Sequence, residues 1–111
     1  IMYSSKSNES DDAIVLNKTV EYEKPKHDSI MHCIKLAIEE DKPIMLDYWV
    51  DSCEQSAIVG VKENGEKLLV KSEDEYTSPI DTIYNTGSEY IIVTENSIYL
   101  VSSKILSKRI A

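Results

Sequence analysis

Apolar positions follow the helical period early in the chain. Between residues 29 and 41 they recur at i, i+3 and i+7, at Met31, Ile34 and Ile38. The stripe is widened by further apolar positions, namely Ile30, Cys33 and Ala37. Asp28 or Ser29 can cap the N-terminal end, and Pro43 lies just past the other end. The pattern predicts an amphipathic helix over residues 29–41.

From Ile44 onward the apolar period changes from 3.6 to 2, which is typical of strands. Residues 44–51 predict a strand with Asp47, Trp49 and Asp51 on one face. The next segment, "AIVGVKENGEKLLVK", predicts a hairpin, because Asn64-Gly65 suits a two-residue type I′ turn. That turn would pair Val61 with Leu68 and Val59 with Val70.

The segment of residues 88–103, "SEYIIVTENSIYLVSS", predicts a second hairpin with Glu95-Asn96 as its loop. In this register Tyr90 opposes Val101, and Ile92 opposes Tyr99. Neither face of the hairpin is polar. The aliphatic face carries Ile91, Val93, Ile98 and Leu100, and the tyrosine face carries Tyr90, Ile92, Tyr99 and Val101. A hairpin on a protein surface has one solvent-exposed, polar face. Because neither face is polar here, we expect both faces to be covered. The second cover is either the protein's own fold, including the helix, or a partner.

These segments predict an α+β, mainly β fold: a helix followed by a five- or six-stranded antiparallel meander over residues 44–106. Strands of this number and length are similar to those of small SH3-like and Tudor-like barrels. We therefore expect a small, strongly bent sheet or a partly open barrel. Residues 1–12 predict a polar tail, and residues 13–111 a single domain in which two short strands, or one strand with a kink, precede the helix.

Charge narrows the classes of partner. The formal net charge is −8, residues 44–106 alone carry −7, and Arg109 is the only arginine. A nucleic-acid surface needs clustered cations, so we expect no nucleic-acid partner. No apolar run is long enough to span a membrane and no signal-peptide pattern is present, so we expect no membrane partner. Two cysteines make no disulfide framework, which favours a reducing, cytoplasmic location.

The sequence contains no recognisable catalytic, metal or cofactor site. The soft metal ligands are His27, His32, Cys33 and Cys53, and no pair of them has zinc-site spacing. We expect Cys33 in the core and His32 on the solvent side of the helix. No glycine-rich phosphate loop occurs, so no nucleotide cofactor is expected.

Three functions remain open. The first is a non-enzymatic acidic protein, of the inhibitor or immunity type, that binds a basic protein partner. Its candidate residues are three aromatic side chains and an acidic run with its tyrosine: Tyr90, Tyr99, Trp49, Glu73, Asp74, Glu75 and Tyr76. The second is a structural or assembly subunit, such as a viral or homo-oligomeric component. The third is a small-molecule binder with Asp47 and Asp51 beside Trp49.

Overall fold

The structure is a computed structural model, and it describes residues 22–110. The predicted tail (residues 1–12) lies outside this range, and so does the strand segment predicted before the helix except for its last residues, Tyr22 and Glu23, which are not in a strand. The elements follow in the order α1 (His27–Glu40), β2 (Ile44–Met45), α2 (Trp49–Cys53), β3 (Ile58–Val61), β4 (Lys67–Ser72), β5 (Glu75–Tyr76), β6 (Ile80–Asn85), β7 (Glu89–Thr94), β8 (Ile98–Ser102) and β9 (Leu106–Arg109).

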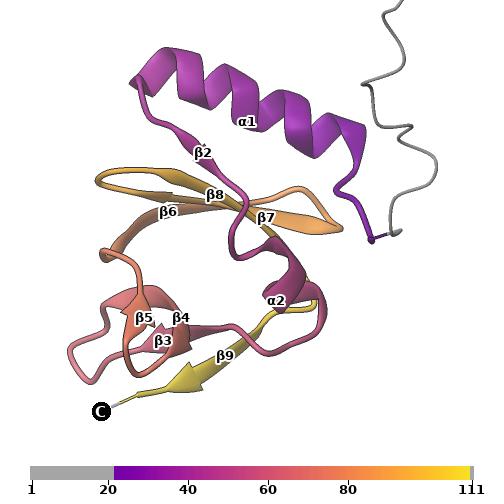
Figure 1. Ribbon diagram of the computed structural model, residues 1–111. Coiled ribbons are helices and arrows are strands. Elements are labelled where there is room, and N and C mark those ends of the chain that lie inside the picture. Colours follow the sequence, from indigo (N-terminus) through magenta and orange to yellow (C-terminus); the bar gives the residue numbers. More distant parts are fainter. Residues whose placement is uncertain (1–21, 111) are drawn as a thin grey trace, which may run out of the picture.

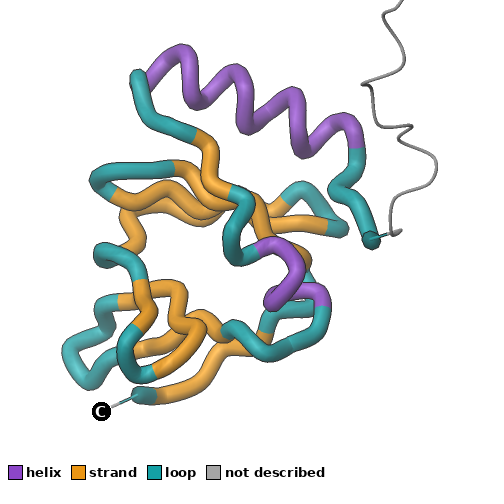
Figure 2. Tube along the Cα trace, in the orientation of Figure 1, coloured by secondary structure: helices purple, strands orange, loops and turns teal. Residues whose placement is uncertain are grey.

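The described residues form three layers. The strands make two four-stranded sheets, in the orders β2-β8-β7-β6 and β5-β4-β3-β9. Helix α1 covers one face of the first sheet, and the second sheet lies on the other side (Figure 1). Figure 2 shows the short helix α2 at one side, where the chain passes from the first sheet to the second. The predicted α+β, mainly β fold with an N-terminal helix is confirmed.

The strand pairing differs from the predicted antiparallel meander in the number of strands and in their direction. Residues 22–110 contain eight strands instead of five or six. Strand β2 pairs with β8, and β3 with β9, in parallel. The strands form no closed barrel. Strand β9 begins at Leu106, the last residue of the predicted meander, and its partner β3 is more than 40 residues away in sequence. Such a pairing leaves no local turn signal by which the sequence could reveal it.

The hairpin of β7 and β8 has the predicted register, with Tyr90 opposite Val101 and Ile92 opposite Tyr99. Both of its faces are covered by the protein's own fold. The aliphatic face packs under α1 in a core that contains Cys33, Trp49, Ile91, Val93, Ile98 and Leu100. The tyrosine face packs against the second sheet in a core that contains Tyr48, Ala57, Val59, Leu69, Ile92, Val101 and Ile105. The two cores make the hairpin the middle layer of the fold.

The predicted register of the β3–β4 hairpin is wrong by one residue. Val59 pairs with Leu69, and Gly60 pairs with Leu68. Among the described residues Asn64 does not have a positive φ, whereas Gly65 has φ 92°. The Gly65 N–H donates to the Lys62 carbonyl and the Lys62 N–H to the Glu66 carbonyl, so the loop has three residues and a glycine bulge. A slip of one residue exchanges the two faces, which places Leu68 on the outer side of the sheet.

The predicted strand over residues 44–51 is also wrong. Only Ile44–Met45 is a strand, and Trp49 begins the short helix α2. The alternation of apolar and polar residues in "IMLDYWVD" fits a strand, but tertiary contacts override it. The buried Ser52 accepts a hydrogen bond from the backbone N–H of Ser102 over 2.8 Å and so ties α2 to the end of β8. Asp47, Trp49 and Asp51 therefore do not share a strand face.

The helix is confirmed at residues 27–40, but the apolar stripe predicted for it is mostly exposed. Ile30, Met31, Ile34 and Ile38 are between 37% and 76% exposed. The side that meets the sheet carries Ser29 and Cys33, both buried, and the partly buried Leu36 and Ala37. Small residues four apart let the helix approach the sheet closely, which periodicity of apolar residues alone does not reveal. In residues 22–110 no helix is long and apolar enough to cross a membrane.

A buried carboxylate anchors the start of α1 to the first sheet. Glu89 in β7 is 4% exposed. It accepts a hydrogen bond from Ser29 Oγ over 2.6 Å and one from the Lys26 backbone N–H over 3.4 Å. A negative charge near a helix N-terminus is favoured by the helix dipole. These bonds compensate for burying Glu89 and fix α1 over the hairpin.

Because the hairpin is buried on both faces, truncation on either face should destabilise the protein. We expect Ile91→Ala and Ile92→Ala each to lower the free energy of unfolding by about 2–5 kcal/mol. Ile83→Ala on the exposed strand β6 is the matched control and should cost less than about 1 kcal/mol. Urea unfolding of the three variants measures this. A cost for Ile92→Ala as small as that of the control would show that the tyrosine face is not core.

Candidate functional site

The three aromatic side chains predicted to contact a partner belong to the fold itself. Trp49 is 7% exposed, and its indole N–H donates to the Glu23 carbonyl over 2.7 Å. Tyr99 packs edge to face against Tyr48, with ring centroids 5.5 Å apart. Tyr90 is partly buried against the core between the sheets. The exposed aromatic patch predicted for these residues is not formed.

The acidic run remains on the surface. Glu73 and Asp74 form the turn between β4 and β5, and Tyr76 in β5 is 61% exposed. Glu75 lies 3.9 Å from Lys71 Nζ, which also lies 3.6 Å from Asp51 and sits over the Tyr48 ring. Glu75 is therefore engaged within the protein. Glu73 and Asp74 make no ion pair with any residue from 22 to 110.

A hollow of about 580 Å³ lies beside this turn on the outer side of the second sheet. We call it the Tyr76 hollow. It is lined by Lys62, Leu68, Val70, Ser72, Glu73, Tyr76 and Ile110. Ile110 lies close because position 60 is glycine: a Cβ there would come within 2.7 Å of Ile110 Cδ1. The hollow joins apolar walls to one exposed aromatic ring, to Lys62 and to the Glu73 carboxylate, which makes no ion pair within residues 22–110.

Sequence reasoning singled out Glu73 and Tyr76 but missed the apolar half of this hollow. In the predicted register Leu68 shared a face with Val61 and Val70. In the structure it shares the outer face with Val70 beneath Ile110. The available signal was Gly65, which also suits a three-residue loop with a bulge.

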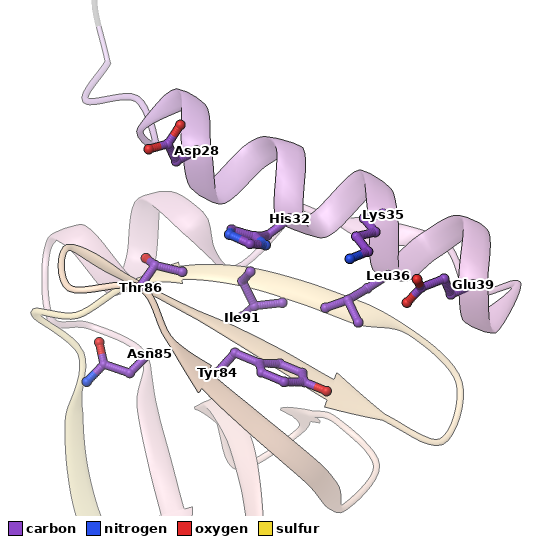
Figure 3. Close-up of a pocket in the computed structure, with 9 residues that line it drawn as sticks. All are labelled: Asp28, His32, Lys35, Leu36, Glu39, Tyr84, Asn85, Thr86 and Ile91. Carbon is purple, nitrogen blue, oxygen red and sulfur yellow. The ribbon is translucent and has the colours of Figure 1, made fainter.

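A second hollow, of about 480 Å³, runs between α1 and the edge of the first sheet. We call it the helix groove. Figure 3 shows Leu36 and Ile91 directed toward each other from the two layers, with the Tyr84 ring below them. The helix also contributes four polar or charged side chains to the lining: Asp28, His32, Lys35 and Glu39.

The remaining candidate chemistry has little support in the geometry. Burial raises the pKa of the Cys33 thiol to about 11, and burial is also the main cause that raises the pKa of Cys53. A raised pKa disfavours the thiolate, which is the reactive form. Cys33 lies in the core and His32 is exposed, as predicted. Within residues 22–110 no three His, Cys, Asp or Glu side chains are grouped to hold a metal ion.

The arrangement expected for a small-molecule binder is not formed. Asp51 lies 3.6 Å from Lys71 and accepts a hydrogen bond from Ser56 Oγ. A shallow hollow of about 250 Å³ does border Trp49, but neither Asp47 nor Asp51 lines it. The two carboxylates and the indole therefore do not form one site.

The comparisons with known proteins identify no relative. No family model matches the chain, and neither a curated protein nor a solved structure matches it.

The core between the sheets contains a phenol whose ionisation should affect stability. Burial, with smaller contributions from Tyr99, Asp47 and other acids, raises the pKa of Tyr48 from 10.0 to about 12. The folded protein thus holds this proton more tightly than the unfolded chain does. The resulting stabilisation is fully present below pH 10 and is lost as the pH rises toward about 12.

We therefore expect Tyr48→Phe to weaken the loss of stability at high pH. At pH 11 the phenol should account for about 1 kcal/mol of the fall in the unfolding free energy of the native chain. Urea unfolding between pH 9 and 11.5 compares the two proteins. Equal slopes for the native chain and the variant would contradict the assignment.

Proposed function

We propose that this chain is a non-enzymatic binding protein, of the inhibitor or immunity type, that recognises a basic protein partner through the Tyr76 hollow. The observation that carries the proposal is the 61% exposed Tyr76 ring, which stands beside the Glu73 carboxylate, unpaired within the described residues, over apolar walls. Exposed aromatic rings with apolar surroundings are enriched in protein interfaces.

An arginine or lysine side chain of the partner suits the apolar walls, the aromatic ring and the carboxylate of this hollow, and Lys62, which also lines it, lies 3.6 Å from Glu66. The methylene stem of the partner's side chain can lie against Val70 and Ile110, and its cationic head can pair with Glu73 at the rim. The Tyr76 ring can add a cation–π contact. Charges at such exposed positions contribute about 0.2–1 kcal/mol each, so affinity depends on the combination.

The charge of the whole chain favours the same class of partner. A net charge of −8 attracts a basic protein at long range and speeds association, an effect that salt screens. The two free cysteines agree with a reducing, intracellular location, which we include in the proposal. The partner is thus expected to be a basic protein of the same compartment.

The simplest test uses a defined probe in place of the partner. We expect N-acetyl-arginine methylamide, titrated into the labelled protein, to shift the amide signals of Leu68, Tyr76 and Ile110 in NMR spectra. The citrulline counterpart has the same shape without the charge and should bind much more weakly. Equal binding of both compounds, or shifts elsewhere in the protein, would count against the proposal.

Variants then assign the charge. Glu73→Gln should weaken binding of the arginine probe about two- to fivefold, because it removes one exposed ion pair. Asp74→Asn is the matched control, since Asp74 carries the same charge on the same turn but does not line the hollow. If both variants weaken binding equally, the overall negative charge of the protein attracts the probe, and Glu73 makes no specific contact with it. Affinity capture, run in parallel with the native chain and with the Tyr76→Ala variant, identifies proteins whose binding requires the hollow.

A further inference from the structure

Within residues 22–110, strand β6 presents an unpaired edge of the first sheet. It is the last strand in the order β2-β8-β7-β6, and among the described residues only β7 pairs with it. Five of its six residues are exposed, from Asp81 to Asn85. An edge strand carries a row of N–H and C=O groups without partners, which can accept a further strand.

In the part of the chain that the structure describes, the other three sheet edges are protected and that of β6 is not. Strands β2 and β5 have two residues each, and β9 carries Lys108 and Arg109. Short length and cationic side chains are the usual means of blocking edge pairing. On β6 a bulge disturbs the ladder between Ile80 and Thr82, but the ladder is regular from Thr82 to Asn85, with no lysine or proline.

The register identifies the groups that face outward. Thr86 N–H donates to the Glu89 carbonyl, so these two residues form a hydrogen-bonded pair. Antiparallel pairs alternate between bonded and non-bonded. Asn85 opposite Tyr90 and Ile83 opposite Ile92 are therefore non-bonded pairs, and the N–H and C=O groups of Ile83 and Asn85 point to the free edge.

A hollow lies on each side of this edge. Tyr84, which pairs with Ile91 on the helix side, lines the helix groove (Figure 3). Ile83, which pairs with Ile92 on the side of the second sheet, lines a hollow of about 300 Å³. That hollow is completed by the β3–β4 turn and by the rest of β6: Gly65, Glu66, Lys67, Ile80, Asp81 and Thr82. Side chains of an added strand alternate between the two sides, so one set would enter each hollow.

The residues that line the two hollows indicate which side chains of an added strand each hollow would accept. The helix groove has an apolar floor, and the opposite hollow is polar, with Glu66 and Asp81 against a single lysine, Lys67. In the helix groove, too, two carboxylates face one lysine. An apolar side chain suits the groove and a basic one suits the opposite hollow. A second copy of this chain would bring a further net charge of −8, which opposes self-association.

We propose that the free edge of β6 is a second binding site, at which an extended segment of a protein partner adds as a strand. Apolar residues of the segment enter the helix groove, and lysines or arginines alternate with them on the opposite side. Main-chain hydrogen bonds to Ile83 and Asn85 supply affinity, and the two hollows supply specificity. This site shares no lining residue with the Tyr76 hollow, so either can exist without the other.

The test uses the blocked heptapeptide Ac-Thr-Lys-Val-Lys-Val-Lys-Thr-NH2, in which apolar and basic residues alternate. Its control, Ac-Thr-Val-Val-Lys-Lys-Lys-Thr-NH2, has the same composition and charge without the alternation. We expect the first peptide to bind at least tenfold more tightly by calorimetry. On binding, the amides of Ile83 and Asn85 should become protected from hydrogen exchange.

Ile83→Pro removes one edge donor while leaving the bonds to β7, because proline is tolerated where an edge N–H faces solvent. It should weaken the alternating peptide at least tenfold, whereas Ile83→Val and Glu73→Gln should not. Urea unfolding shows whether the proline variant is folded. If it is not, the comparison of the two peptides on the native chain still tests the proposal. Equal binding of the two peptides would refute strand addition. A dimer of the native chain that Ile83→Pro dissolves would assign the edge to a second copy instead.

Discussion

A hairpin without a polar face is the constraint on which the rest of the structure depends. Strands β7 and β8 are apolar on both sides, so burying one side against a single layer would leave the other in water. The chain meets this by covering the aliphatic side with α1 and the tyrosine side with the second sheet. The covering elements come from both sides of the hairpin in sequence. Helix α1, β3 and β4 precede the hairpin, and β9 follows it and pairs with β3.

The position of the hairpin also explains where binding surfaces are available. The central residues are occupied on both faces, so Tyr90, Tyr99 and Trp49 serve the fold. The surfaces left over lie at the periphery of the layers. They are the outer side of the second sheet, where the Tyr76 hollow forms, and the edge of the first sheet at β6. The two hollows beside β6 each have two carboxylates and one lysine in their lining, whereas the Tyr76 hollow has one of each, Glu73 and Lys62.

Buried polar contacts decide how the layers are joined. Glu89 could have been a costly buried charge, but it lies at the start of α1, where Ser29 and the Lys26 N–H contact it. Ser52 similarly joins α2 to the end of β8. These contacts connect residues 50 or more positions apart, so no local pattern announces them. They explain why α1 turns its small residues, and not its largest apolar ones, toward the sheet.

By itself the sequence determined the elements whose signals are local. The helix and the register of the last hairpin follow from periodicity, because each is set by neighbouring residues and one turn. Tertiary structure decided the rest. The contact of α2 with β8 replaced the strand expected after Met45. The Gly65 bulge that moved the β3–β4 register is local, but the hollow in which Leu68 then lies also needs Ile110, which is distant in sequence. The layers packed against a helix or a sheet decide which apolar stripe is buried and which edge stays free. These layers come from distant parts of the chain, so the sequence of one segment does not reveal them.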